Sequence, residues 1–204
     1  MLGPAQLLRA AGYSTLLIDF QATGESPGEA ITFGWHERLD VIAAVAWLRE
    51  SAPNEPIGIL GRSLGGAATI LAGSRLEVQA AVLEAVYPSI EAAVDNRLRI
   101  RLGSVGPWLS PLLLAQLPPR LGVRPADLRP VEHIGELRCP VLLIAGTADE
   151  HTTVGDTRQL FVAARQPKEL WLIAGANHAG YERIAGDLYA QRLLTFFNRN
   201  LRGD

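Results

Sequence analysis

Short apolar runs alternate with longer segments of helical periodicity along most of the chain. Five runs have the length and composition of buried strands: Thr15–Asp19, Ile57–Leu60, Ala80–Leu83, Val141–Ile144 and Leu170–Ile173. Helices are predicted around them at Ala5–Ala11, Glu37–Leu48, Leu64–Gly73, Val154–Ala164 and Tyr181–Asn200. This alternation predicts the α/β class, with a mostly parallel sheet flanked by helices.

The stretch from about Val94 to Pro130 interrupts the alternation. It holds six arginines against two aspartates, and it has repeated prolines that exclude one long helix. We therefore expect a small cap of short helices, inserted at 94–130 over the edge of the sheet that carries the chemistry. Arginines beside Trp108 and Leu112 also suit a membrane-surface or acyl-chain-binding patch, and that alternative stays open.

Length, charge and cysteine content exclude several classes of protein. With 204 residues the chain suits a single domain, 1–204, and its net charge of −2 gives no reason to expect nucleic acid. Cys139 is the only cysteine, which excludes an intrachain disulfide and a cysteine-rich metal site. No apolar run approaches the roughly 18 residues of a membrane span, and Met1–Pro4 does not read as a secretory signal. The default expectation is a cytoplasmic location, subject to what precedes Met1.

The most informative motif is a serine between two glycines. Ser63 stands between Gly61 and Gly65, directly after the predicted strand 57–60 and before an alanine-rich helix. This pattern is typical of a sharp strand-to-helix turn that presents a nucleophilic serine. The helix would begin at Leu64, whose backbone N–H would then be one donor to a developing oxyanion.

A serine hydroxyl is a weak nucleophile until an oriented base accepts its proton. Of the four histidines, His36 opens a helix, His133 lies in a polar connection, and His151 is placed to line a pocket. His178 lies in a loop just after the last predicted strand, and position therefore favours it as the base.

The carboxylate that orients the base should also follow a strand. Asp149 does so after Val141–Ile144, and we predict it as the acid of the triad. Glu84, at the end of the preceding strand, is the second candidate.

The order Ser63, Asp149, His178 is that of the α/β-hydrolases, and the chain resembles that superfamily. It looks most similar to the serine hydrolases grouped with dienelactone hydrolases, acyl-peptidases and serine aminopeptidases. Residues 19–26 resemble the family's D-x-x-x-x-G-x-S loop, although many members carry Arg-Gly where this chain has Gln21 and Ala22. The resemblance implies hydrolysis of an ester, thioester or amide through an acyl-enzyme. No metal or organic cofactor is expected, because neither metal-ligand spacing nor a nucleotide-binding motif is present.

The resemblance also implies that N-terminal strands of the family fold are missing from this chain. Three strands that precede the first helix in family members have no counterpart here, and the loop that supplies the second oxyanion donor would be missing with them. The third of these strands would lie between Thr15–Asp19 and Ile57–Leu60, so both would lose a neighbour. We therefore expect an N-terminally truncated hydrolase fold, with Met1 an internal residue of a longer protein; a genuinely shortened chain is the alternative.

Two classes of function remain open. The first is a serine hydrolase acting on a small acyl substrate or, as an esterase-like or peptidase-like variant, on a short peptide. The second is a catalytically impaired fragment or a non-catalytic binding protein on a hydrolase scaffold.

Overall fold

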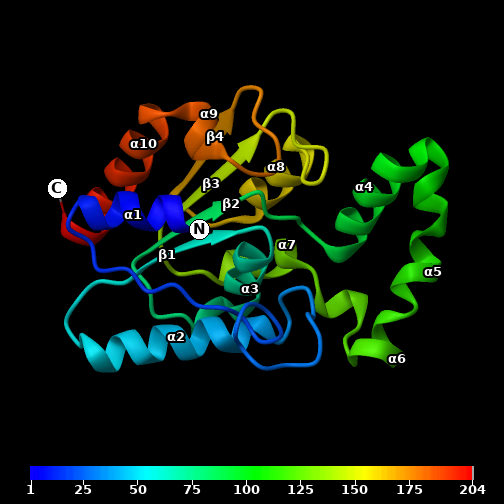
Figure 1. Cartoon of the computed structure of the whole chain (residues 1–204), viewed down its shortest axis with the longest axis horizontal. Helices are drawn as coiled ribbons and strands as arrows, with labels where there is room; N and C mark the ends of the chain where they lie inside the picture. The colour runs from blue at the N-terminus through cyan, green and yellow to red at the C-terminus, as the bar shows by residue number, and fades with distance from the viewer. Residues whose placement is uncertain (204) are drawn as a thin grey trace.

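A computed structural model describes residues 1–203. Four parallel strands form one sheet, in the order β1-β2-β3-β4, which is also their order along the chain (Figure 1). Their bounds are Gly58–Arg62 for β1, Ala80–Glu84 for β2, Val141–Gly146 for β3 and Lys168–Ile173 for β4. Because all strands run the same way, their carboxyl ends meet at one edge, where α/β folds gather functional loops.

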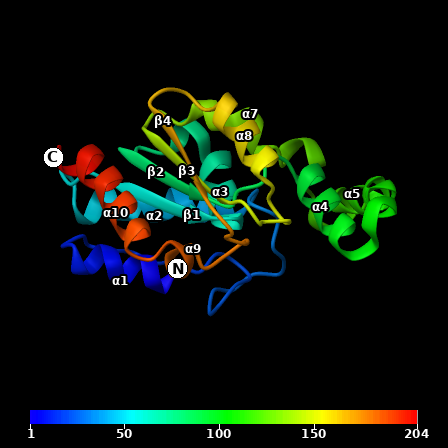
Figure 2. The same ribbon diagram turned by 90° about the horizontal axis from the view of Figure 1, so that it is seen from above.

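Helices cover both faces of the sheet, as Figures 1 and 2 show. One apolar cluster joins alternate strand residues such as Ala81 and Leu83 to α2 (Glu37–Ser51), α3 (Leu64–Ala72) and α8 (Val154–Ala163). The other joins Ala80 and Val82 to α1 (Leu2–Ala10), α9 (Tyr181–Ala185) and α10 (Asp187–Phe197). The two central strands, β2 and β3, are largely apolar because all of their residues are buried. The predicted fold class is confirmed.

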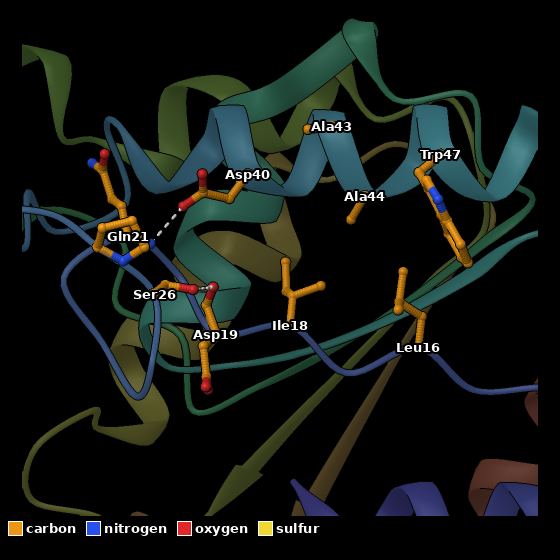
Figure 3. Close-up of a pocket in the computed structure, with 10 residues that line it drawn as sticks. Leu16, Ile18, Asp19, Gln21, Ser26, Asp40, Ala43, Ala44 and Trp47 are labelled. Atoms are coloured by element: carbon orange, nitrogen blue, oxygen red, sulfur yellow. Dashed lines mark hydrogen bonds between the residues drawn. The ribbon is translucent and has the colours of Figure 1, made fainter.

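The predicted strand Thr15–Asp19 is wrong. Residues 13–20 have no regular secondary structure and pair with no strand, so β1 lies at the edge of the sheet. Leu16 and Ile18 are partly exposed and face Ala44 and Trp47 of α2 across a hollow of about 450 Å³ (Figure 3). An apolar β-prone run becomes a strand only when a neighbour lies about 4.8 Å away to share its hydrogen bonds, and this segment has no such neighbour among residues 1–203.

The predicted helix Tyr181–Asn200 is also not continuous. It breaks at Gly186, which has a φ of 52° and separates α9 from α10, and it ends in a π-helical turn at Asn198–Arg202. A left-handed φ suits glycine, which lacks the Cβ that would clash there. The break lets α9 and α10 take different directions over β4.

The stretch at 94–130 is made of short helices, as the prolines predict. These are the end of α4 (Ile90–Leu102), then the 3₁₀ helix η2 (Gly103–Leu109), α5 (Ser110–Leu114), α6 (Leu117–Leu121) and the 3₁₀ helix η3 (Pro125–Asp127). Figures 1 and 2 show that α4, α5 and α6 project away from the sheet. The chain then returns through α7 (Pro130–His133) and the 3₁₀ helix η4 (Ile134–Glu136) to β3.

The two ends of this cap meet at a narrow neck. The N–H of Ile90 donates to the carbonyl of Leu128 at 2.9 Å, and the N–H of Val131 donates to the carbonyl of Pro88 at 2.9 Å. The helix α4 begins at this neck, where the Ser89 side chain accepts a hydrogen bond from the N–H of Ala92 and caps the helix.

Candidate active site

The serine turn lies between β1 and α3. Ser63 has a φ of 49°, which is rare for a residue with a Cβ and marks a tight, strained turn. Its backbone N–H donates to the carbonyl of Glu84 at 2.8 Å, and this bond fastens the turn to the end of β2. Leu64 is the first residue of α3, so its N–H has no acceptor within the helix.

The neighbouring glycines are not equally constrained. A Cβ on Gly61 would lie 2.8 Å from the carbonyl oxygen of Gly65, and one on Gly66 would lie 2.2 Å from Cγ2 of Val86. Both distances are shorter than real contacts allow, so these two positions need glycine. A Cβ on Gly65 would meet only the Phe20 ring, at an ordinary 3.7 Å. The tight turn therefore requires glycine at Gly61 and Gly66, and it leaves room for a Cβ at Gly65.

The structure brings together the three side chains predicted as a triad. Nε2 of His178 lies 3.2 Å from Oγ of Ser63, and Nδ1 of His178 lies 2.8 Å from Oδ2 of Asp149. The first distance suits transfer of a proton from the hydroxyl to the ring. The second suits an Nδ1–H that donates to the carboxylate and leaves Nε2 free to accept.

The Asp149 carboxylate is fixed before any substrate arrives. Its side chain is fully buried, and its Oδ1 accepts hydrogen bonds from the backbone N–H groups of His151 at 2.8 Å and Thr152 at 2.9 Å. With one oxygen held by the backbone, the other is directed at His178. Buried carboxylates are stable only when they are bonded in this way.

The loops that carry the acid and the base are bound to each other. The N–H of Ala148 donates to the carbonyl of Ala176 at 2.9 Å, and the N–H of Gly175 donates to Oγ1 of Thr147 at 2.8 Å. The hydroxyl oxygen of Tyr181, in α9, accepts the N–H of Gly146 at 3.1 Å. The Asp149 and His178 loops therefore form one hydrogen-bonded unit above β3 and β4.

Glu84, the second candidate for the acid, does not contact His178. Its carboxylate is buried beneath the serine turn, where Oε2 accepts from Nε of Arg62 at 2.7 Å and Oε1 accepts from the Tyr189 hydroxyl at 2.7 Å. A second nitrogen of Arg62 reaches Oε2 of Glu182 in α9, at 3.2 Å. Glu84 is thus part of an ion-pair network that supports the serine turn.

Sequence reasoning missed this network. Burial raises the pKa of the Glu84 carboxyl, although the charge of Arg62 opposes the shift. For Arg62, burial lowers the pKa but Glu84 outweighs it, so the net shift is upward and the guanidinium stays charged. Burial, together with the nearby Glu84 charge, also raises the pKa of Tyr189, which keeps its hydroxyl as a donor. The one feature of the sequence that could have indicated this network is Arg62, a charged residue directly before Ser63.

The remaining histidines lie in three different settings. The His151 ring packs edge-on against the His178 ring, with centroids 5.3 Å apart, and its buried Nδ1 has no hydrogen-bond partner in the described part of the chain. His36 immediately precedes α2, and His133 pairs with Glu136 at 2.9 Å. Of these three, His151 is the one whose ring contacts His178.

The hollow of Figure 3 is separate from the triad. None of the three triad side chains lines the hollow of Figure 3, which lies between residues 16–27 and α2. Within residues 1–203, no group of three or more His, Cys, Asp or Glu side chains could hold a metal ion. No helix in the same range is both long and apolar enough to cross a bilayer.

Sequence comparisons point in the same direction as the fold. Residues 4–97 match the X-Pro dipeptidyl-peptidase (S15) family, a stretch that includes Ser63 but neither Asp149 nor His178. The uncharacterized protein YqkD of Bacillus subtilis (strain 168) is 29% identical over 174 residues, covering 82% of this chain and 56% of YqkD. The uncharacterized protein Rv2307c of Mycobacterium tuberculosis (strain ATCC 25618 / H37Rv) is 28% identical over 197 residues, covering 94% of this chain and 62% of Rv2307c. The chain thus spans less than two thirds of either relative.

Three solved structures with the same fold are described as an esterase, an alpha/beta hydrolase and a lipase. The Pyrococcus furiosus esterase Pf2001 matches with a TM-score of 0.80 at 23% identity, over 98% of this chain and 76% of that chain. The alpha/beta hydrolase GrgF from Penicillium sp. sh18 matches with a TM-score of 0.74 at 20% identity, over 98% and 84%. A Paleococcus ferrophilus monoacylglycerol lipase matches with a TM-score of 0.63 at 22% identity, over 94% and 85%.

The chain has the α/β-hydrolase fold, as its sequence resemblance implied. The S15 match and the esterase and lipase neighbours together support a hydrolase.

Proposed function

We propose that this protein is a serine hydrolase that cleaves carboxylic esters through an acyl-enzyme. Ser63 attacks the carbonyl while Nε2 of His178 takes the hydroxyl proton, and the resulting imidazolium returns that proton to the leaving group. Asp149 keeps the proton on Nδ1 of the ring and stabilises its positive charge. Water then attacks the acyl-enzyme by the same route and releases the acid. The N–H of Leu64 donates to the oxyanion in both steps.

One observation carries this proposal. The hydrogen-bonded chain from Ser63 through His178 to Asp149, at 3.2 and 2.8 Å, joins side chains that lie 115 and 29 residues apart. A structural role explains a buried aspartate or a loop histidine separately, but it gives no reason for a strained serine at the end of the same chain of hydrogen bonds. A binding protein on this scaffold has no use for that alignment.

An ester is favoured over a peptide by two neighbours, described as an esterase and a lipase, that match over 98% and 94% of this chain. A neighbour described as a puromycin-hydrolyzing peptidase matches over 83% of this chain, and the S15 peptidase match ends at residue 97. The peptidase alternative is testable with a dipeptide whose second residue is proline.

The test uses an activated-serine probe and two substrates. We expect a fluorophosphonate to label the protein, p-nitrophenyl butyrate to be hydrolysed, and Ser63→Ala to abolish both. Ser74→Ala, at an exposed serine in the turn Gly73–Arg75, is the matched control and should change neither. Absence of labelling in a folded protein would contradict the hydrolase. Faster cleavage of alanyl-prolyl-p-nitroanilide than of the ester would contradict the esterase.

A further inference from the structure

The far end of the cap exposes an unusual number of large apolar side chains. We call residues 97–113, from the last turns of α4 through η2 to α5, the cap tip. Trp108 is 87% exposed, Val105 67% and Leu112 66%, although such residues are usually buried. Ile100, Leu102, Leu109 and Leu113 are exposed as well. The elements α4 and α5 lie at the end of the molecule farthest from α1 and α10 in both views (Figures 1 and 2).

The charge of the cap tip has one sign. It contains three exposed arginines, Arg97, Arg99 and Arg101, and no acidic residue. Within residues 1–203 these three form no ion pair; Arg97 and Arg99 donate only to a backbone carbonyl and an amide oxygen. The nearest acid on α4, Asp95, instead accepts a hydrogen bond from the Ser110 hydroxyl.

Two arginines outside the cap tip are neutralised. Arg124 pairs with Asp127 at 2.8 Å, and Arg129 pairs with Glu91 at 2.8 Å and with Glu132 at 3.2 Å. Of the four cap arginines that form no ion pair within residues 1–203, three lie among the exposed apolar side chains of the cap tip, and the fourth is Arg120 of α6. An exposed tryptophan and leucines beside unpaired arginines suit the boundary between headgroups and acyl chains of a bilayer.

We propose that the cap tip docks on the surface of a bilayer that contains anionic lipids. The apolar side chains enter the headgroup boundary, and the three arginines bind lipid phosphates. Each arginine near an anionic surface strengthens binding about fivefold, so the three together give about a hundredfold. A second copy of this chain is a poor alternative occupant, because two identical cap tips would bring six arginines together.

Docking would bring the candidate active site close to the lipid. The middle of α4 is bonded to residues beside the site, since Nδ2 of Asn96 donates to the carbonyl of His151 at 3.3 Å and to Oδ2 of Asp156 at 2.8 Å. The His151 ring contacts the ring of His178. The substrate class that follows, acyl esters carried in a lipid surface, rests on the proposed function; the docking itself does not.

The first experiment measures vesicle binding without catalysis. The Ser63→Ala protein is floated with phosphatidylcholine vesicles with and without phosphatidylglycerol, at low and at physiological salt. We expect binding that requires phosphatidylglycerol and weakens with salt. Arg97→Gln/Arg99→Gln/Arg101→Gln should weaken it about a hundredfold, and Trp108→Ala/Leu112→Ala should weaken it at both salt concentrations.

Matched controls lie on α8, outside the cap tip. Arg158 is an exposed arginine and Val162 is 77% exposed. Arg158→Gln therefore removes an exposed positive charge, and Val162→Ala an exposed apolar side chain, outside the cap tip. Both variants should bind vesicles as tightly as the parent protein does. All variants should keep the parent's thermal midpoint, because the altered side chains are exposed. Three results would each overturn docking. The protein could fail to bind anionic vesicles, or the α8 controls could lose as much vesicle binding as the cap-tip variants. The protein could also self-associate without binding vesicles, with self-association lost in Trp108→Ala.

A second experiment separates docking from catalysis. In protein with Ser63 intact, the Trp108→Ala/Leu112→Ala variant should keep its rate on soluble p-nitrophenyl butyrate and lose rate on monoolein in anionic vesicles. Fluorophosphonate labelling without vesicle binding would refute docking and leave the hydrolase standing. Vesicle binding without labelling would refute the hydrolase and leave docking standing.

Discussion

Nε of Arg62 lies 2.7 Å from Oε2 of Glu84, directly beneath the turn that holds Ser63. The same guanidinium reaches Glu182 in α9, the short helix that begins three positions after His178. A single arginine therefore connects the serine turn to the segment that carries the base. Because Glu84 is fully buried, this connection depends on both charges being present.

We expect Arg62→Met to lower the free energy of unfolding by about 3–5 kcal/mol, because it leaves the buried Glu84 carboxylate without its cation. Urea denaturation measures this change. Arg183→Met, at an exposed arginine of α9, should shift stability by less than about 0.5 kcal/mol. The double variant Arg62→Met/Glu84→Gln should recover part of the loss, and a double variant as unstable as the sum of two independent losses would contradict the pairing.

The same variant should have a pH-dependent defect. Burial already raises the pKa of Glu84 in the folded protein, so the folded state holds this proton more tightly than the unfolded chain does. Stability from this group is present below the unfolded pKa of about 4.3 and is lost as pH rises through the folded value. Removing Arg62 raises the folded pKa further. The stability deficit of Arg62→Met should therefore be small near pH 4 and grow toward pH 7, as thermal unfolding across that range would show.

Replacing the carboxylate behind His178 tests the assignment of the acid. Asp149→Asn should reduce kcat on p-nitrophenyl butyrate by about 10⁴, the size of this effect in a serine protease triad, because an amide favours the wrong imidazole tautomer. Glu84→Gln, at the second candidate, should retain activity within about tenfold once corrected for folded protein. The reverse ranking of these two variants would assign the acid to Glu84.

The space around Gly66 gives a steric prediction. Gly66→Ala should destabilise the protein by about 1–3 kcal/mol, because the new Cβ would lie 2.2 Å from Cγ2 of Val86. Adding Val86→Ala should recover much of that loss by removing the clashing methyl group. Gly155→Ala in α8 meets only an ordinary 3.5 Å contact with Thr153 and should stabilise the helix by about 0.5–1 kcal/mol.

The single cysteine should be inert in the folded protein. Burial raises the pKa of the Cys139 thiol to about 11, so little thiolate is present at pH 8. Iodoacetamide should modify Cys139 only after denaturation, which mass spectrometry can follow. The raised pKa also means that this thiol's contribution to stability is complete below about pH 8.5 and is lost as pH rises toward 11. Cys139→Ala should remove that loss, and rapid labelling of the native protein would contradict this account.

The sequence was sufficient for those parts of the structure that follow from local pattern and strand direction. Four apolar runs became parallel strands, and residues that follow them, such as Asp149 and His178, necessarily reach one edge of the sheet. Thr15–Asp19 has the same composition, but strand formation depends on a neighbour that composition does not reveal. Gly186 is visible in the sequence, but its presence alone does not predict that the helix ends there and continues in another direction.

The ion pairs beneath the serine turn lay beyond such reasoning. Arg62 and Glu84 are 22 residues apart, and Arg62 and Glu182 are 120 apart. No periodicity relates these positions, and each residue alone has an unremarkable explanation as a surface charge. Only the packing of α9 over the sheet shows that all three carry buried or half-buried charges.

The neck of the cap makes the molecule modular. Residues 88–90 and 128–131 are held together by two backbone hydrogen bonds, while the loops of Ser63, Asp149 and His178 are tied to one another through β2, α9 and the end of β4. A foreign helical insert whose ends are equally close, and which supplies a donor in place of Asn96 for the carbonyl of His151 and for Asp156, could be grafted at these two points without moving the reacting groups. Substrate preference could then diverge between related chains by exchange of this one segment, with the chemistry inherited unchanged.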